Sequence, residues 1–434
     1  MFSNTVCYCW QAIFKFVQVL NSFKKYIFST FASRFTIGII NLLLLTVSAR
    51  VLGDVGRGVI NLFVVHMAVI HTASELMAGP SVVFFATRIP SAQIRLIALT
   101  WSFIIVSLLT VLVLVFQTLP EEWVFLLWTA SFLTAFTSIQ MQLRAGREQL
   151  LGYNLINASI PILQIIFFMG AVYFLGPDLH HYFSSWLLAL GVVSIAILPD
   201  WFKDFEGKID RQSLQSSVLE MFSRGKWVFI ANLFYTLAIR FSYWMIDTWQ
   251  GKAMLGRFGT GVTITESVLV ITGSMAFVVY AKISNAGKEN IPDIGRLSAM
   301  AFWLTTIVCI ILALIPSTLW TFILGKDFAD VPSVIRVYAP AVCILSISIV
   351  LSNYFAGQGL YHLSAFGSLS AFFGAVISGY FLVRYFGTIG AAFSILCGNL
   401  AQVVWLLYSF QNNEKKTTVK QFFTPFFTPY LLFK

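Results

Sequence analysis

The chain has 434 residues, of which 58% are hydrophobic and only 11% are charged, against about 25% in soluble proteins. Its mean hydropathy is +0.82 and its net charge is +10. These values exclude a soluble globular enzyme, a disordered chain and a disulfide scaffold. Runs of about ten alternating apolar and polar residues, which a membrane β-barrel requires, are absent. We therefore predict an all-α polytopic membrane protein.

The first predicted element is an N-terminal amphipathic segment at residues 1–26, on the cytoplasmic side. Phe14, Val17 and Leu20 follow helical spacing, and Lys15 and Lys24 lie near them. This pattern is typical of a helix that lies along the membrane surface. We expect no cleavable signal peptide, because a basic start and a clean apolar run do not occur there.

Stretches with few or no Asp, Glu, Lys or Arg mark the membrane spans, since about 20 apolar residues cross a bilayer; Glu75, Arg240 and Glu266 interrupt three of them. They predict an N-lobe at residues 27–199, a charged cytoplasmic linker at 200–226, a C-lobe at 227–410 and a cytoplasmic tail at 411–434. The spans of the N-lobe are 35–49, 58–85, 96–120, 123–143, 149–177 and 179–199. Those of the C-lobe are 226–249, 258–281, 297–325, two within 337–383 divided at 357–359, and 385–413. The total is about twelve.

The loop charges predict the orientation, because Lys and Arg concentrate in cytoplasmic loops. With the N-terminus in the cytoplasm, 20 of the 28 cations fall on the inner side and seven on the outer side. Both termini are therefore expected in the cytoplasm. The +10 balance reflects this bias and attraction to anionic lipid, so no nucleic-acid partner is needed.

Short glycine motifs occur at matching places in the two halves. Residues 55–57 (VGR) match 255–257 (LGR), and 145–147 (AGR) match 356–358 (AGQ). Gly176 matches Gly387, with the same offset of 211 residues as the second pair (387 minus 176). Parallel repeats of this kind predict two pseudo-symmetric six-helix lobes around a central cavity. Such transporters bind their substrate between the lobes and work by alternating access.

Several of these motifs carry a resemblance to a known family. They read FASRFTIG (31–38), ARVLG (49–53), YAKIS (280–284), LGKDFAD (324–330), AGQG (356–359) and FGTIGAA (386–392). Over about residues 27–410 the chain resembles the polysaccharide flippase branch of the multidrug/oligosaccharidyl-lipid/polysaccharide exporter superfamily. The resemblance implies export of undecaprenyl-pyrophosphate-linked glycans across the bacterial cytoplasmic membrane, in O-antigen or capsule biosynthesis.

The same resemblance implies the partners. The substrate would be a lipid-linked oligosaccharide, and membrane lipids, a polysaccharide polymerase and glycosyltransferases would be partners of a monomeric transporter. We expect no enzymatic activity, no cofactor and no metal site, with Na⁺ or H⁺ as the coupling ion. A phosphate-cradling GxxxxGK[ST] loop is absent from the sequence, which argues against direct ATP drive.

Arg240 is the strongest site candidate, because an ionisable residue within a span is costly and suggests function. Tyr243 and Asp247 fall on the same helical face, at i+3 and i+7. One hypothesis is contact with a phosphate or sugar, for which guanidinium suits bidentate binding. The alternative is a structural ion pair of Arg240 with Asp247 or Glu266. Related flippases often carry an acid beside this arginine, where Ser242 stands here.

Arg34 is the second substrate-binding candidate. It follows Ser33 at the start of the first span, in a context similar to that of an arginine that helps the lipid II flippase bind pyrophosphate. Gly38 lies one position later than in that pattern, and Ile40 stands near the place of the family's second arginine. The alternative is a snorkelling arginine that sets the topology.

Ion coupling has four candidates: His66, His71, Glu75 and Glu266. The first three spread over a polar arc of the second span, with Glu75 expected near mid-membrane. A carboxylate could bind a proton or Na⁺, and a histidine titrates near neutral pH. The alternatives are hydrogen-bonded histidines and a protonated or paired Glu75. The five-residue step from His66 to His71 argues against a metal site.

Five further arginines are candidates for gates or mouths. Arg50 and Arg57 flank the first external loop, where interfacial snorkelling is the favoured interpretation and an outward gate the alternative. Arg88, Arg144 and Arg147 lie at the cytoplasmic mouth. They would meet an anionic headgroup, although topology alone explains their place.

The preferred hypothesis is therefore a twelve-helix flippase for lipid-linked oligosaccharide repeat units. One alternative is an ion-coupled extruder of drugs or organic cations with the same fold, which would favour acidic residues in the cavity. Another is a non-transporting scaffold that keeps the fold and recruits a partner.

Overall fold

The computed structural model describes the backbone of residues 2–203, 211–286 and 293–413, and residues 422, 424 and 426. Side chains are described from Thr36 onward, apart from some beside these gaps. The predicted amphipathic segment at 1–26 and the candidate Arg34 therefore lie outside the described side chains. The central part of the predicted linker and most of the predicted tail also lie outside the described residues.

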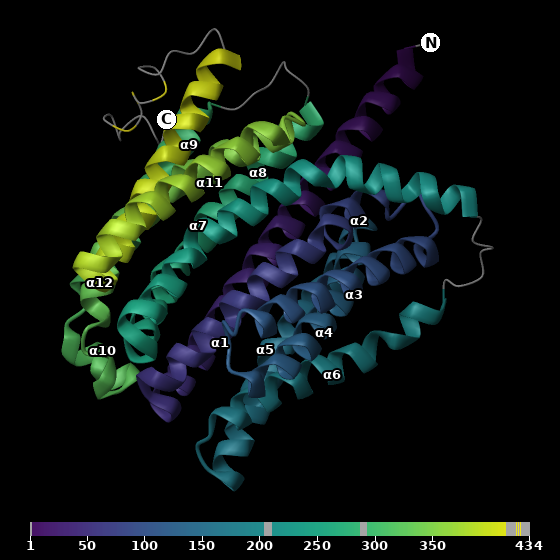
Figure 1. Cartoon of the computed structure of the whole chain (residues 1–434). Helices are drawn as coiled ribbons and strands as arrows, with labels where there is room; N and C mark the ends of the chain where they lie inside the picture. The colour runs from purple at the N-terminus through teal and green to yellow at the C-terminus, as the bar shows by residue number, and fades with distance from the viewer. Residues whose placement is uncertain are drawn as a thin grey trace.

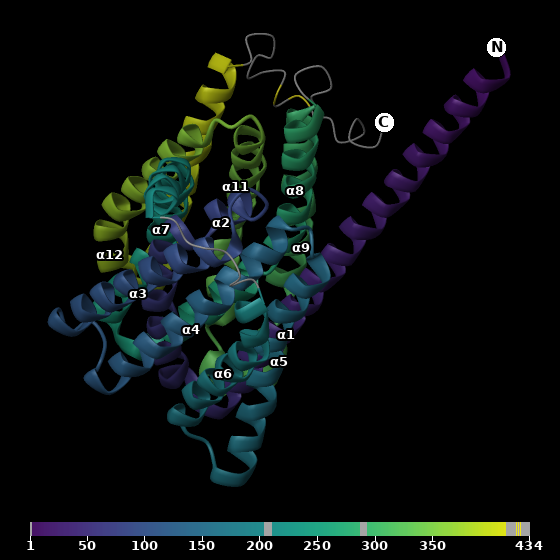
Figure 2. The same ribbon diagram turned by 90° about the vertical axis from the view of Figure 1, so that its right-hand side faces the viewer.

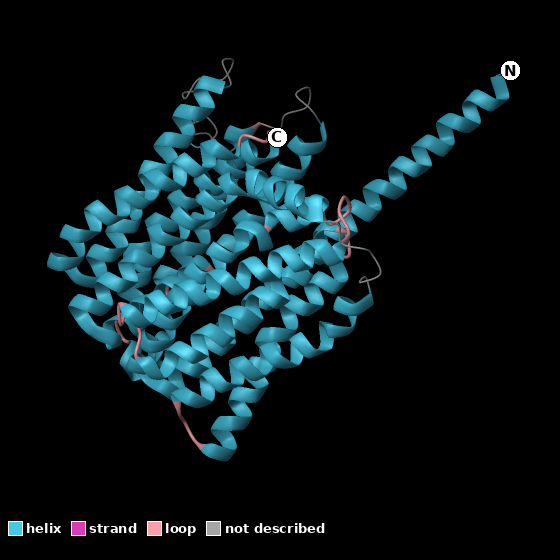
Figure 3. Cartoon of the chain, turned by 45° about the vertical axis from the view of Figure 1, so that its right-hand side comes forward, coloured by secondary structure: helices cyan, strands magenta, loops and turns pink. Residues whose placement is uncertain are grey.

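The described ranges are helical and contain no strand (Figure 3). In chain order the α-helices are α1 (Phe2–Ala78), α2 (Pro80–Phe85), α3 (Ser91–Val115), α4 (Glu121–Gly146), α5 (Leu150–Leu175), α6 (Leu179–Lys203), α7 (Arg211–Glu266), α8 (Leu269–Ala286), α9 (Ile294–Leu314), α10 (Ser317–Leu324), α11 (Val331–Gly357) and α12 (Tyr361–Asn413). A short 3₁₀ helix, η2, spans Lys326–Phe328.

Three of the long helices contain a sharp break at a glycine. The φ angles are 66° at Gly53 in α1, 82° at Gly251 in α7 and 61° at Gly387 in α12. Glycine adopts this left-handed region without the steric cost that other residues meet. Each break separates two membrane spans, so these three helices supply six spans.

Nine helices of the described chain are long and apolar enough to cross a membrane, and the three broken ones are among them. The second arm of α7 continues into α8 after a turn at Ser267 and Val268, and the two form one span. Twelve spans result, at the places that the uncharged stretches predicted. The all-α polytopic fold is confirmed.

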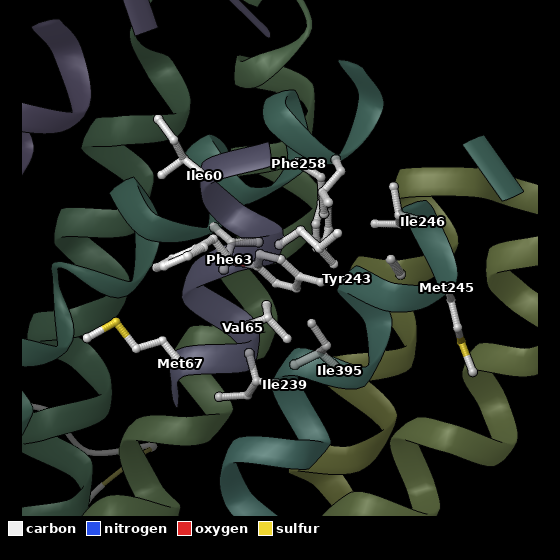
Figure 4. Close-up of a cluster of buried hydrophobic side chains, with 14 of the residues drawn as sticks. Ile60, Phe63, Val65, Met67, Ile239, Tyr243, Met245, Ile246, Phe258 and Ile395 are labelled. Carbon is white, nitrogen blue, oxygen red and sulfur yellow. The ribbon is translucent and has the colours of Figure 1, made fainter. Parts of the chain in front are cut away.

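The spans form two lobes. In Figure 1 the N-lobe helices α3–α6 lie at the lower right and the C-lobe helices α8–α12 lie toward the upper left, with α1 and α7 between them. Figure 2 views the molecule from the N-lobe side, with α3, α4 and α6 in front. Helices α1 and α7 pack along each other at the boundary. A buried apolar cluster joins them, with Phe63 and Val65 from α1 and Ile239 and Tyr243 from α7. Figure 4 shows Tyr243 directed from α7 toward α1.

The repeat motifs correspond to structural landmarks, with one correction. Helices α4 and α11 end at the matched residues Gly146 and Gly357, and Gly176 and Gly387 both have positive φ. The match of Gly56 with Gly256 is two residues out of register, because the equivalent breaks Gly53 and Gly251 lie 198 positions apart (251 minus 53). Gly58, not Gly56, is the counterpart of Gly256.

Candidate functional site

The two lobes touch through their backbones at one end of the bundle, where α1 and α7 break. We call this the closed end. A Cβ atom at Gly58 would overlap the carbonyl oxygen of Lys252, and a Cβ atom at Gly256 would overlap that of Asp54. The two contacts are reciprocal, since each glycine faces the start of the other lobe's second arm. Only glycine permits so close an approach.

Ion pairs and hydrogen bonds add to these backbone contacts. Arg257 of the C-lobe lies 2.7 Å from Asp54 of the N-lobe and 2.9 Å from Asp330 at the start of α11. Arg50 of the N-lobe donates to the carbonyl oxygen of Phe322 in α10, at 2.6 Å. Arg257 thus holds carboxylates of both lobes, and the lobes are closed against each other at this end.

We expect Asp54→Asn to weaken the closed end modestly, because partly exposed ion pairs contribute only about 0–1 kcal/mol. The reporter is Thr260→Cys in a chain whose native cysteines are replaced, since Thr260 is fully buried two turns inside the closed end. Its labelling by an impermeant maleimide should rise about threefold. Arg336→Ala is the control, because Arg336 donates within its own lobe, to Ala313. Unchanged labelling would contradict the role of Asp54.

Arg57 is buried, with 5% of its surface exposed. The favoured interpretation of interfacial snorkelling is wrong for this residue, because α1 turns it inward after the break at Gly53. Its Nη1 donates to Ser48 Oγ (3.2 Å) and its Nη2 to Asn61 Oδ1 (3.3 Å), while Nε has no hydrogen-bond partner. Arg50 is exposed and bonded to α10, so the structure does not bring these two arginines together.

Arg240 lies at the lobe boundary, in the first span of the C-lobe, which is the arm of α7 before the break at Gly251. Its guanidinium carbon is 5.1 Å from the centre of the Tyr243 ring, which confirms the predicted i+3 neighbour. Asp247 binds Lys252 instead, with Nζ 2.7 Å from a carboxylate oxygen. The pairing of Arg240 with Asp247 is therefore wrong. Lys252 lies just past the break at Gly251, and this turn brings its side chain back onto α7.

Glu266 lies close enough to Arg240 for the two charges to interact, although the pair is not in ion-pair contact. It ends the second arm of α7, and its carboxylate accepts a hydrogen bond of 2.9 Å from the Tyr338 hydroxyl of α11. The hydroxyls of Tyr235, Tyr243 and Tyr338 also lie within electrostatic range of the guanidinium. We call these five residues the Arg240 cluster.

Tyr243 lies between two arginines. It is 1% exposed, and the charges of both Arg240 and Arg57 act on it. Arg57, Tyr243 and Arg240 thus form a row from near the closed end into the lobe boundary. With Glu266 ionised, the row and its single carboxylate carry one net positive charge.

Sequence reasoning did not select Tyr235, Tyr338, Asp54, Arg257 or Asp330 as site residues. The two tyrosines lie on α7 and α11, which are far apart in the chain. Their only signal was a hydroxyl within an apolar span. The three charged residues fall between the spans predicted from the sequence, where charge is ordinary.

The ion-coupling candidates of α1 divide into two groups. His66 has Nδ1 2.8 Å from Leu62 O and Nε2 2.9 Å from Thr118 Oγ1. His71 and Glu75 face each other one turn apart, at 3.8 Å. Glu75 is not central in its helix as expected; it lies in the last turn of α1, before the bend at Gly79.

The mouth arginines lie at the end of the bundle opposite the closed end. Arg88 donates to Phe84 O (3.1 Å) and stacks on the Phe84 ring. Arg144 binds the carboxylate of Asp200 and donates to Gly152 O (3.1 Å). Arg147 follows the last residue of α4. Within the described part of the chain, no three His, Cys, Asp or Glu side chains are grouped to hold a metal ion.

Removing the carboxylate of Glu266 tests its assignment to ion coupling. Glu266→Gln should abolish any dependence of transport on a Na⁺ or H⁺ gradient, because the amide binds neither ion in the same way, and lower the rate about tenfold. Tyr338→Phe removes only the hydrogen bond and should cost about threefold. The measurement is transport of the lipid-linked oligosaccharide in proteoliposomes under imposed Na⁺ or H⁺ gradients. Gradient dependence that survives in Glu266→Gln would assign coupling elsewhere, with His71 and Glu75 as the next candidates.

Comparisons with known proteins identify the fold. No family model and no curated protein matches this sequence. Among solved structures, it is similar to an inward-facing MATE family multidrug resistance transporter of the MOP superfamily (18% identity, TM-score 0.69, 90% of this chain and 100% of that chain). It is also similar to the lipid II flippase MurJ in an inward closed conformation (13%, 0.72, 93% and 91%).

A third similar structure is a MOP superfamily transporter from Pyrococcus furiosus (19% identity, TM-score 0.62, 89% of this chain and 95% of that chain). All three likenesses extend over most of both chains, and at these identities they concern the fold. This chain is a multi-pass helical membrane protein with the two-lobed fold of the solved MATE and MurJ structures.

Proposed function

We propose that this protein is a flippase that moves undecaprenyl-pyrophosphate-linked oligosaccharide repeat units across the bacterial cytoplasmic membrane for cell-surface polysaccharide biosynthesis. The observation that carries this proposal is Arg240. Its guanidinium lies within the spans at the lobe boundary, and among the described residues no carboxylate is in ion-pair contact with it. A cation without a bound counter-charge is costly inside a membrane and suits an anionic ligand.

The chemistry of the Arg240 cluster fits a pyrophosphate headgroup. Guanidinium donates two parallel hydrogen bonds to phosphate oxygens, and the tyrosine hydroxyls beside it are donors for the same oxygens or for sugars. Arg57 offers a second cation behind Tyr243, with an Nε that has no partner. Two cations against one carboxylate favour an anion over a cation at this place.

The distribution of charge supports an orientation. The arginines of the closed end, Arg50 and Arg257, belong to the cation-poor side of the chain, and Arg88, Arg144 and Arg147 belong to the cation-rich side. By the positive-inside rule the closed end then faces outward and both termini are cytoplasmic. In this state a headgroup would enter from the cytoplasm, and parting of Arg257 from Asp54 would release it outside while the lipid tail stays in the bilayer.

The energy source and the partners belong to the same proposal. Na⁺ or H⁺ binding at Glu266, or the membrane potential acting on the anionic headgroup, would drive the cycle. A polymerase that joins the exported units and the glycosyltransferases that build them would be the functional partners of a monomeric transporter.

An ion-coupled extruder of organic cations is the second candidate, since the MATE structure named above is described as a multidrug resistance transporter. Glu266 favours this candidate, because a partly buried carboxylate within the spans attracts cations. Arg240 opposes it, because its positive charge repels an organic cation within the same cluster.

The deciding experiment assays both activities. The purified protein is placed in liposomes with a polyprenyl-pyrophosphate oligosaccharide, and the headgroup exposed on each leaflet is measured with an impermeant glycosidase. Dye efflux is measured in parallel, and in cells that lack the gene. Headgroup movement with unaltered dye efflux supports the flippase. Dye efflux that depends on the protein, with no headgroup movement, would refute the flippase proposal and support the extruder.

A further inference from the structure

The C-lobe contains a cavity of about 330 Å³ that shares only Tyr235 with the Arg240 cluster. The described residues that line it belong to three helices of the C-lobe, α7, α11 and α12. This volume is at the lower end of the range for small-molecule sites. The cavity is therefore large enough for one or two small polar groups and too small for a complete oligosaccharide.

The described lining residues are neutral, and apolar side chains provide most of their surface. Among these residues are hydroxyl and amide groups from all three helices, and none of them is acidic or basic: Asn232, Ser348, Asn353, Ser364, Ser368 and Gln402. A pocket without a carboxylate is poorly suited to an organic cation or a bare metal ion, and one without a cation is poorly suited to a phosphate. Neutral hydroxyl and amide groups are suited to the hydroxyls of a sugar.

Two of these side chains are buried without a hydrogen-bond partner. Ser348 is 1% exposed and Gln402 is 3% exposed, and both Ser348 Oγ and Gln402 Oε1 lack a partner although they line the cavity. A buried polar group without a partner destabilises the fold, so most such groups are satisfied. Two of them at one cavity, on α11 and α12, offer hydrogen-bonding groups to a ligand that carries hydroxyls.

Tyr235 connects the cavity to the Arg240 cluster. Its side chain lines the cavity, and its hydroxyl lies within electrostatic range of both Arg240 and Glu266. A ligand that extends from the cavity past Tyr235 would reach Arg240 with its anionic end. This is the arrangement of a sugar joined directly to a pyrophosphate.

We propose that this cavity binds the neutral sugar next to the pyrophosphate, while Arg240 binds the pyrophosphate itself. The inference rests on the proposed function and adds a determinant of specificity to it. Ser348 and Gln402 would accept and donate hydrogen bonds with sugar hydroxyls, so a lipid pyrophosphate without a sugar would gain nothing from them.

The test compares two probes in proteoliposomes: polyprenyl pyrophosphate carrying one neutral hexose, and the same lipid pyrophosphate without a sugar. Ser348→Ala and Gln402→Met each remove one polar group at little change of volume. Each should raise the KM for the hexose-bearing probe about three- to tenfold and leave the sugar-free probe unchanged. Ser346→Ala is the matched control, because Ser346 is a buried serine of α11 bonded to Cys343 and outside the cavity lining.

The outcomes separate this inference from the proposed function. Suppose that the wild-type protein moves both probes. If each variant affects the two probes equally, or if the variants have no effect, the sugar site is refuted while the flippase stands. If the wild-type protein moves neither probe, the proposed function fails and the inference fails with it. A loss confined to the hexose-bearing probe supports the site and also demonstrates that the variants fold.

Discussion

Replacing Arg240 by alanine should lower the rate of headgroup movement about 100-fold. Charge-assisted hydrogen bonds to phosphate are among the strongest polar contacts in proteins. Removing the guanidinium also leaves Glu266 as the one charge of the Arg240 cluster, so the cluster would repel a pyrophosphate. The measurement is the leaflet assay with the hexose-bearing lipid pyrophosphate, at matched protein density in the membrane.

Two further variants make this prediction specific. Arg240→Lys keeps the charge but loses the planar fork, so it should keep a tenth or less of the rate. Arg384→Ala is the control, because Arg384 is an exposed arginine of the C-lobe, outside the Arg240 cluster. It should transport at the wild-type rate. Normal transport by Arg240→Ala would refute the role of Arg240, and with it the observation on which the flippase proposal stands.

The sequence predicted the fold well because membrane folds depend on simple quantities. Span length and loop charge are local properties, so both can be read from the sequence without knowing which helices are neighbours. The breaks at Gly53, Gly251 and Gly387 fall between predicted spans. The matched glycines predicted two lobes correctly, since a repeated turn leaves the same residue at each copy.

The contacts between side chains were less predictable, because they depend on which way each helix faces. Arg240 and Tyr243 are three residues apart on one helix, so their contact follows from helical geometry. Asp247 lies on the same face, yet the turn at Gly251 brings Lys252 back to it and removes it from Arg240. Arg57 was expected in a loop at the interface, and the break four residues earlier directs it into the lobe boundary.

The functional partners from distant spans could not be predicted at all. Tyr338 reaches Glu266 across 72 positions of the chain, and a tyrosine in a span has no periodic signal that separates a site residue from an interface anchor. The reciprocal contacts of Gly58 and Gly256 were missed for a different reason. The repeat was aligned by matching Gly56-Arg57 with Gly256-Arg257. The backbone contacts match Gly58 with Gly256, which is two residues away from that alignment.

Those reciprocal contacts lead to the second large effect, since Gly256→Val should force the closed end open. The added Cβ would overlap the carbonyl oxygen of Asp54, a backbone atom that moves only if the start of the second arm of α1 moves with it. Destabilising one of two conformations by a few kcal/mol shifts their populations by about 100-fold. The protein should then rest in the conformation open at this end.

Labelling of Thr260→Cys measures that shift directly. We expect at least a tenfold faster reaction with the impermeant maleimide in Gly256→Val than in the parent. Adding Gly58→Val, whose Cβ would overlap Lys252, should increase the rate further. Headgroup movement should fall at least tenfold in both, because a transporter fixed in one conformation cannot complete its cycle. Asp54→Asn removes one ion pair and leaves the backbones in contact, so its smaller effect on the same reporter follows from the same geometry.

Gly273→Ala is the matched control for the helix itself. Gly273 lies in α8 of the same lobe, and a Cβ atom there has no neighbour within 4 Å, so labelling and transport should stay at the parent values. If Gly256→Val is present in the membrane at normal abundance and Thr260→Cys still reacts slowly, the contact of Gly256 with Asp54 does not hold the end closed. Slow labelling together with normal transport would place the outward opening elsewhere in the lobe boundary. Fast labelling with lost transport would establish that the two reciprocal glycines are what lets the lobes close, and that closing them is a step of the cycle.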